Sequence, residues 1–182
     1  MLVLASSSPR RQQILRDAGI PFVVRPSNIP EELSPGESPG NYVRRLAEEK
    51  AFGVPIESGE IVLAADTVVV VEGQVLEKPL DRADAWRMLN LLSGRRHEVL
   101  TGVCLRAESR KIVDTATTRV RFVRLTPEEI EEYVRSGEPM DKAGAYAIQG
   151  LASKFIDRIE GDYFNVVGLP IALVYVQLKK LS

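Results

Sequence analysis

The sequence predicts an α/β domain with a mixed β-sheet flanked by helices, and three observations support this prediction. First, short apolar runs typical of strands alternate with segments that have the apolar spacing of helices. Second, several neighbouring strand candidates are joined by tight turns such as Glu72-Gly73, which indicate antiparallel hairpins. Third, no internal repeat, low-complexity tract or clear linker divides the 182 residues. We therefore expect a single domain over residues 1–182, whose sheet contains both parallel and antiparallel strands.

Each element has a local signal. Strands are expected at 1–5, 21–25, 61–65, 68–71, 74–77, 98–106 and 112–125. Helices are expected at about 9–18, 41–52, 82–92 and 126–135, with a last one after Pro170. Ser8 before Pro9 predicts an N-cap, and Thr126 with Glu129 has the spacing of a capping box. We also expect Trp86 to face inward, and 155–160 to form a hairpin with 163–167.

The composition excludes several classes of protein. The 24 basic residues nearly balance the 25 acidic ones, so no overall basic character favours nucleic acid. A single cysteine, Cys104, leaves no internal disulfide or cysteine metal cluster, and a single histidine, His97, leaves no multi-histidine metal site. No apolar run reaches the ~18 residues of a membrane span, and the N-terminus lacks the order of a signal peptide. We therefore expect a soluble cytoplasmic protein.

The hexapeptide SSSPRR, residues 6–11, is the first candidate site. It joins a strand candidate to a helix, so backbone N–H groups and hydroxyls are expected to gather at one point, as a phosphate requires. Arg10 and Arg11 stand at the positive end of the helix dipole, which is unfavourable unless an anion lies between them. A capped helix with two solvated arginines explains the same residues, and the P-loop pattern GxxxxGK[ST] is absent.

Asp66 is the second candidate, because it interrupts the apolar run LAADTVVVV. An unpaired buried carboxylate costs about 5 kcal/mol, so Asp66 must be paired, bound to a metal or placed at an open strand end. Lys50 lies near the apolar face of the helix expected at 41–52, and Lys78 follows a strand in LEKP. Each lysine alone is typical of a solvated side chain. Together with Asp66 and the two arginines they suit a polyphosphate and its metal.

Two further segments carry polar groups that suit a nucleotide. Glu31 and Glu32 lie in a loop, where they are either solvated or further oxygen ligands for Mg²⁺. The segment DKAGAYAIQG, residues 141–150, contains small residues that allow close backbone approach. Its Gln149 carries an amide that can pair with the edge of a nucleobase, although a tightly packed loop explains the pattern equally well. We interpret His97 as a structural or rim residue and not a catalytic one, and Cys104 as a core residue.

The segments SSSPRR, AADTVV with EKP, LSGRRHEVLTGV, and SGEPMDKAGAYAIQG with GDYFNVVGLP together resemble the Maf family of nucleoside triphosphate pyrophosphatases. They spread from residue 6 to residue 170. DKAGAYAIQG resembles the subgroup that acts on dTTP and UTP, whereas the sister subgroup preferring 7-methyl-GTP lacks this glutamine. The resemblance implies a Maf/ITPase-like α/β fold with two lobes and a central cleft. It also implies hydrolysis to the monophosphate and pyrophosphate with a divalent metal, Mg²⁺, Mn²⁺ or Co²⁺.

The resemblance also assigns roles to single residues. Asp66 matches the family's catalytic acidic residue, as a general base or as a metal ligand. Glu31 is the best match to the acidic residue of the loop, with Glu32 as the alternative because Pro30 stands where a second acid is often found. The family's specificity positions correspond to Arg10, Thr67 and Gln149. Its phosphate-binding positions correspond to Ser6, Ser8, Arg11, Lys50 and Lys78.

Two other classes of function would use similar groups. Family members are also associated with arrest of cell division and septum formation, so the protein could sense a nucleotide without turning it over. A sensor would leave the costly Asp66 without a role. A nucleotidyltransferase would require a second substrate, whereas water is a simpler acceptor. We therefore predict a hydrolase whose substrates are dTTP and UTP. The family suggests a homodimer, although no exposed stripe in the sequence indicates one.

Overall fold

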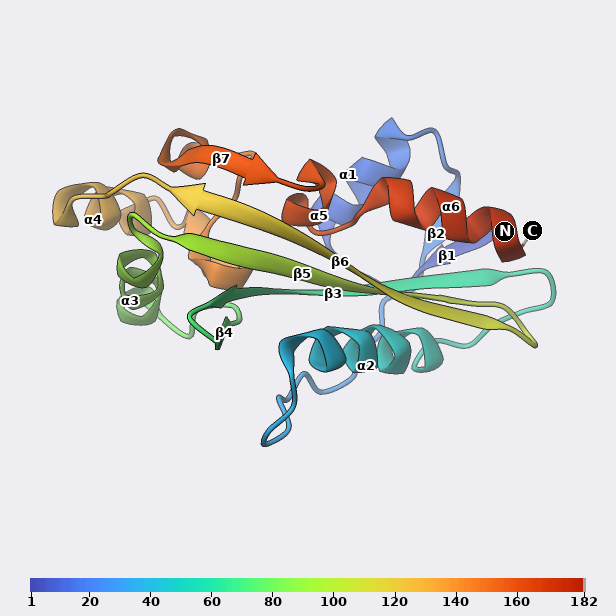
Figure 1. The fold of residues 1–182 in the computed structure, drawn as a ribbon. Helices are drawn as coiled ribbons and strands as arrows, with labels where there is room; N and C mark the ends of the chain where they lie inside the picture. The colour runs from blue at the N-terminus through green and yellow to red at the C-terminus, as the bar shows by residue number, and fades with distance from the viewer. Residues whose placement is uncertain (182) are drawn as a thin grey trace. The chain divides into compact units, whose positions relative to one another are not determined.

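The computed structural model describes residues 1–181 and confirms the mixed α/β fold (Figure 1). Its strands are β1 (Leu2–Leu4), β2 (Phe22–Val24), β3 (Ile61–Val71), β4 (Gln74–Leu76), β5 (Arg96–Arg106), β6 (Lys111–Phe122) and β7 (Ile156–Glu160). Its α-helices are α1 (Pro9–Asp17), α2 (Pro39–Phe52), α3 (Arg82–Leu92), α4 (Pro127–Arg135), α5 (Tyr163–Val167) and α6 (Ile171–Leu181). Three 3₁₀ turns follow α4, namely η1 (Glu138–Asp141), η2 (Ala143–Ala145) and η3 (Leu151–Phe155). Within the described residues, no helix combines the length and apolar character needed to cross a membrane.

The strands pair in the order β2-β1-β3-β5-β6-β7, and β4 pairs with β3. β1 is parallel to both β2 and β3, with Leu2 beside Ile61 and Leu4 beside Leu63. β4 returns antiparallel along β3, and β7 is antiparallel to β6. Helix α1 connects β1 to its parallel neighbour β2, and a tight turn connects β3 to its antiparallel partner β4. The antiparallel strands β6 and β7 are instead separated by α4 and the three 3₁₀ turns. The predicted mixed sheet is therefore confirmed.

The chain divides into two compact units. The first contains Met1–Thr67, Thr101–Ala116 and the described residues from Gly168 onward, and the second contains Val68–Leu100 and Thr117–Val167. Strands β3, β5 and β6 each contribute residues to both units. The expected single domain over residues 1–182 and the expected central cleft stay predictions.

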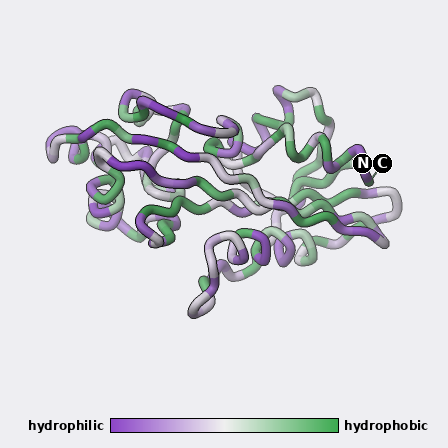
Figure 2. The backbone as a smooth tube through the Cα atoms, viewed as in Figure 1, coloured by the Kyte–Doolittle hydropathy of each residue, from purple (hydrophilic) through white to green (hydrophobic). Residues whose placement is uncertain are grey.

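In the first unit, α2 covers one face of the strands, and α1 and α6 lie over the opposite face (Figure 1). The residues buried between α2 and the strands are small or β-branched, namely Val3, Ala5, Ala47, Ala51, Val54, Val62, Ala64 and Cys104. Figure 2 shows that hydrophobic residues run along the strands, while the loop between β2 and α2 is mostly hydrophilic or neutral. Burial raises the pKa of the Cys104 thiol to about 12, so Cys104 is an inert core residue, as predicted.

The backbone of α2 lies directly against β5 at Gly102. A Cβ atom built on Gly102 would lie only 2.1 Å from the carbonyl oxygen of Val43 in α2. No real side chain can occupy that space without moving the helix or the strand. Gly102 therefore sets the distance between α2 and the sheet of the first unit.

Two expectations for the second unit are wrong. Trp86 is 37% exposed, because the buried stripe of α3 is formed by Ala85, Met88, Leu89 and Leu92 and Trp86 lies at its edge. Residues 163–167 form helix α5 instead of a hairpin strand. The Asp162 carboxylate accepts a hydrogen bond from the backbone N–H of Phe164 (2.8 Å), which favours a helical turn over the β-propensity of this segment.

Buried Asn165 explains why α5 stays in place. Its side-chain amide donates to the backbone carbonyl of Val99 and to the hydroxyl of Thr118, each at 3.0 Å. Asn165 and Thr118 are both fully buried. A strand over 163–167 would remove this amide from its acceptors and leave buried polar groups unsatisfied.

His97 lies in an aromatic cluster of the second unit. Its Nε2 atom is 2.8 Å from the Tyr146 hydroxyl, and the rings of Phe122 and Tyr146 contact it edge-on. Its Nδ1 atom has no hydrogen-bond partner within the described residues. Burial lowers the pKa of His97 to about 4, so the imidazole is neutral at pH 7. This environment agrees with the structural role predicted from the sequence.

We expect His97 to make stability pH-dependent. Its pKa is about 4 in the folded protein and near 6.5 when unfolded, so the unfolded chain binds the extra proton. The stabilisation by neutral His97 is complete above pH 6.5 and is lost as the pH falls through 4, by about 3 kcal/mol in total. Urea unfolding of His97→Gln between pH 4 and 7 should show a shallower fall than the wild type. Identical pH slopes for the two proteins would contradict this role.

Candidate active site

The turn SSSPRR folds as a helix cap, as predicted. The Ser8 side chain accepts a hydrogen bond from the backbone N–H of Arg11, and Pro9 occupies the first turn of α1. The Ser6 hydroxyl accepts from the backbone N–H of Ser8 (3.2 Å) and from Nη1 of Arg11 (3.3 Å). Both serines therefore shape the turn between β1 and α1.

The Arg11 side chain donates hydrogen bonds to three acceptors of the first unit. Its Nε atom donates to the carbonyl oxygen of Gly168 (2.8 Å) and its Nη2 atom to the hydroxyl of Thr67 (3.2 Å). Burial lowers the pKa of Arg11, while the negative charges of Asp66 and Glu31 oppose that effect. The hydrogen bonds and the two negative charges offset the cost of placing this cation at a helix N-terminus. Arg11 holds the turn against β3 and against the segment that precedes α6.

Sequence reasoning missed Thr101 and Gly168. The Thr101 hydroxyl lies 2.9 Å from that of Thr67, and Thr101 is fully buried. The Gly168 carbonyl oxygen is the acceptor for Arg11. A hydroxyl inside an otherwise apolar strand was the available signal for Thr101. No sequence signal identifies a backbone carbonyl 157 residues away from its donor.

Asp66 and Lys50 form the centre of the site. Lys50 Nζ lies 2.6 Å from Oδ1 of Asp66 and 2.7 Å from Oε1 of Glu31. Asp66 is nearly buried in β3, which runs unbroken through it where the sequence predicted two separate strands. Lys50 is also buried, on the apolar face of α2 where the sequence placed it. The ammonium group therefore offsets the cost of burying the carboxylate.

The same three side chains indicate where a divalent cation would fit. Asp66 and Glu31 both reach one cation, the Lys50 ammonium, so two carboxylates already converge on a single position. In the part of the chain that the structure describes, no group of three or more histidine, cysteine or acidic residues could hold a metal. Mg²⁺ in proteins is commonly bound by one or two carboxylates, and its remaining ligands are water molecules and phosphate oxygens. Asp66 and Glu31 are therefore the residues that would suit a hard cation here.

The predicted site residues fall into two groups. Ser6, Ser8, Arg10, Arg11, Glu31, Lys50, Asp66 and Thr67 belong to the first unit. Lys78 and Gln149 belong to the second unit. Lys78 follows β4, and Gln149 is exposed on the turn that precedes η3. The structure therefore brings most of the cationic and acidic candidates together in one unit and places the candidate base-reading amide in the other.

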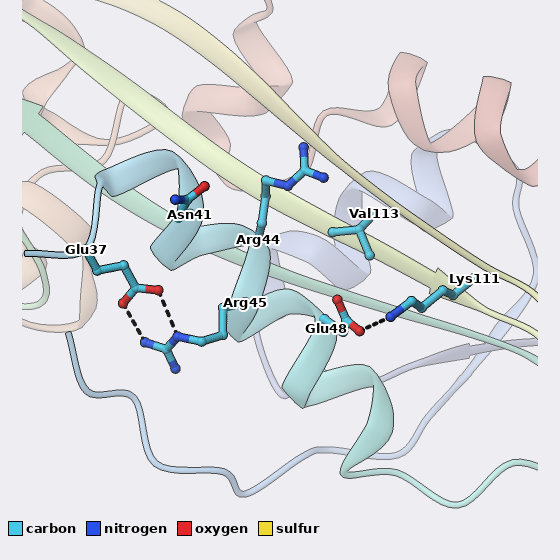
Figure 3. Close-up of a pocket in the computed structure, with 7 residues that line it drawn as sticks. All are labelled: Glu37, Asn41, Arg44, Arg45, Glu48, Lys111 and Val113. Atoms are coloured by element: carbon cyan, nitrogen blue, oxygen red, sulfur yellow. Dashed lines mark hydrogen bonds and ion pairs between the residues drawn. The ribbon is translucent and has the colours of Figure 1, made fainter. Parts of the chain in front are cut away.

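A separate polar cavity of about 480 Å³ lies beside α2 (Figure 3). It is lined by Glu37, Asn41, Arg44, Arg45, Glu48, Lys111 and Val113, and it contains none of the predicted site residues. Arg45 pairs with Glu37, and Lys111 pairs with Glu48, as the dashed lines in Figure 3 mark. Its basic groups are therefore largely neutralised by acidic groups of the same wall.

The capped N-terminus of α1, with an arginine beside it, is an arrangement that suits an anionic ligand. A family model described as "Maf-like protein" matches residues 1–181. The chain belongs to the Maf family.

Curated relatives match over nearly the whole chain. A protein from Koribacter versatilis is 53% identical over 98% of this chain and 93% of its own length, and is named "dTTP/UTP pyrophosphatase". A protein from Symbiobacterium thermophilum with the same name is 56% identical over 93% of this chain and 88% of its own length. The solved structure of the Staphylococcus aureus Ham1 protein matches with a TM-score of 0.54 and 14% identity, over 100% of this chain and 99% of that one. That last similarity confirms the expected fold.

We expect the Lys50–Asp66 pair to contribute strongly to stability. Lys50→Met should lower the free energy of unfolding by about 3 kcal/mol, because it leaves the Asp66 carboxylate buried without its partner. Lys111→Met is the matched control, since its pair with Glu48 is partly exposed and should contribute less than about 1 kcal/mol. Urea unfolding at pH 7 measures both values. Similar losses of unfolding free energy in the two variants would show that the buried pair contributes no more to stability than the partly exposed pair.

Proposed function

We propose that this protein hydrolyses dTTP and UTP between the α- and β-phosphates and releases the monophosphate and pyrophosphate. The observation that carries the proposal is the buried Asp66–Lys50 pair, which is linked to the Ser6–Arg11 turn through Thr67. The substrate class follows from relatives that are 53% and 56% identical to this chain over the aligned residues and are named dTTP/UTP pyrophosphatases.

In the proposed reaction, Asp66 acts as the general base. Its carboxylate accepts a proton from water while the water oxygen forms a bond to the α-phosphorus. The bond between the α-phosphorus and the oxygen that bridges to the β-phosphate breaks, and that oxygen leaves with pyrophosphate. Lys50 holds Oδ1 of Asp66 in place, and its positive charge offsets the negative charge that gathers around the reacting phosphates.

The remaining candidates position the substrate. Arg11 braces the turn through three of its own hydrogen bonds, so its role is to keep the N-terminus of α1 in place and to supply positive potential. Arg10 and Lys78 supply cationic groups to the triphosphate. Thr67 and Gln149 read the pyrimidine, whose 4-oxo group and N3–H suit an amide that donates and accepts.

Asp66 and Glu31 would hold the divalent cation, Mg²⁺, Mn²⁺ or Co²⁺. When bound, such a cation would stabilise the negative charge on the phosphate oxygens. Lys50 already contacts both carboxylates, so it would share them with the cation. Asp66 would then serve both as a ligand and as the group that orients water.

Asp66→Asn should lower dTTP turnover at least ~100-fold, the usual scale for loss of a general base, while the protein stays folded. Pyrophosphate release is measured from dTTP, UTP, CTP, ATP and GTP with Mg²⁺ or Mn²⁺, for the variant and the wild type. Near-wild-type turnover by folded Asp66→Asn would remove Asp66 from the chemistry. If the wild type binds dTTP without releasing pyrophosphate, the protein is a nucleotide sensor and the proposed hydrolysis is rejected.

Two neighbouring acids test the metal assignment. Glu31→Gln should raise the Mg²⁺ concentration needed for half-maximal turnover about tenfold or more, because it removes one oxygen ligand. Glu32→Gln is the matched control and should leave that concentration unchanged. Chelation should abolish turnover in both proteins, and added Mg²⁺ should restore it. A shift in Glu32→Gln instead of Glu31→Gln would transfer the metal role to Glu32.

A further inference from the structure

The turn that carries Gln149 is held on both sides by one tyrosine–glutamate pair. The Tyr133 hydroxyl donates to Oε1 of Glu138 (2.8 Å) and accepts from the backbone N–H of Ala147 (3.2 Å). The Oε2 atom of Glu138 accepts from the backbone N–H of Leu151 (3.1 Å). The residues two positions before and two positions after Gln149 are therefore tied to the same pair.

The pair is well suited to this anchoring role. Tyr133 is buried on α4, and burial together with the nearby Glu138 carboxylate raises the pKa of its phenol above the usual value. The phenol therefore stays a neutral donor at all working pH values. Glu138 starts η1 and uses both of its oxygens, one toward the tyrosine and one toward the backbone of the turn.

The turn also lies in direct contact with the Glu138 carboxylate. A Cβ atom built on Gly150 would be only 2.3 Å from Oε2 of Glu138. Gly150 closes the turn by donating its backbone N–H to the carbonyl oxygen of Ala147 (3.1 Å). The absence of a side chain at this position therefore lets the carboxylate reach the backbone beside Gln149.

The other end of the same segment is anchored next to Lys78. The backbone N–H of Gly144 donates to the carbonyl oxygen of Glu77 (3.1 Å), the residue that precedes Lys78. Within residues 1–181, no hydrogen bond from the Gln149 side chain to another residue holds it, and the residue is exposed. The hydrogen bonds of the turn therefore set where the backbone of Gln149 lies.

We propose that Tyr133 and Glu138 are positioning residues for substrate choice: they hold the Ala147–Leu151 turn so that Gln149 presents its amide to a 4-oxo pyrimidine. This inference rests on the proposed hydrolysis of dTTP and UTP. Cytosine carries a 4-amino donor and an N3 acceptor, which reverses the hydrogen-bonding pattern that thymine offers. A displaced amide therefore affects the choice between dTTP and dCTP, and neither Tyr133 nor Glu138 is among the residues proposed to act on the phosphates.

The test measures kcat/KM for dTTP and dCTP in the wild type and in variants of the pair. Glu138→Ala should lower the ratio of the dTTP value to the dCTP value about tenfold, because the N–H of Leu151 loses its acceptor. Tyr133→Phe, which is nearly isosteric, should lower the ratio less. Glu138→Gln keeps the volume and one acceptor oxygen, so it should retain a ratio between those of Glu138→Ala and the wild type. The matched control is Glu132→Ala, an exposed acid on α4 that should leave the ratio unchanged.

A double-mutant comparison shows whether the pair acts through Gln149. Gln149→Ala alone should lower the ratio, and adding Tyr133→Phe or Glu138→Ala to it should lower the ratio no further. Losses that add in the double variants, or equal losses for dTTP and dCTP, would overturn the proposal and make the pair merely structural. A wild type that fails to hydrolyse dTTP would reject the proposed function itself. A wild type that hydrolyses dTTP and dCTP equally well would reject the role of the pair in substrate choice. A wild type that prefers dTTP, with variants that keep the preference, would reject only the role of the pair.

Discussion

The site depends on a lysine that neutralises a carboxylate inside a buried strand. Asp66 has strand neighbours that are almost entirely apolar, so it is stable there only because Lys50 lies at 2.6 Å. This requirement determines where α2 must pass, since the lysine is on the face of the helix that packs against the strands. The same ammonium group contacts the carboxylates of Asp66 and Glu31, so it also holds the loop that carries Glu31 next to the strand. One charge compensation thus ties a strand, a helix and a loop into a single arrangement.

Around this centre, neutral hydroxyls bring the polar groups together. Arg11 is partly buried, and its three guanidinium nitrogen atoms meet a carbonyl oxygen and the hydroxyls of Ser6 and Thr67. Thr101 extends the set by contacting Thr67 from β5. The turn between β1 and α1 is therefore fixed by hydrogen bonds before any ligand is considered. Such a framework costs little reorganisation when charge develops next to it, which is the main source of electrostatic catalysis.

Much of this arrangement was predictable from local signals. The caps at Ser8 and Thr126 and the need of Asp66 for a partner follow from residue types and spacing alone, and the structure contains all three. The identity of the partners did not follow, because Lys50 had several candidate roles and Arg11 binds a carbonyl that is distant in sequence. Helix α5 was missed because an aspartate cap and buried Asn165 outweigh the strand propensity of its residues. The roles assigned to Lys78, Gln149 and a homodimer stay predictions.

The close contact at Gly102 has a consequence for how mutational data on this protein are interpreted. The Val43 carbonyl rests where a side chain would be, so the height of α2 above the sheet is set by a residue that lacks functional groups. Lys50 lies two helical turns further along α2, and its reach to Asp66 depends on that height. Intolerance to substitution at Gly102 would therefore look like the signature of a catalytic residue. In this fold, a residue can be sensitive to mutation because it positions the reacting groups, as Gly102 does, and not only because it takes part in the reaction.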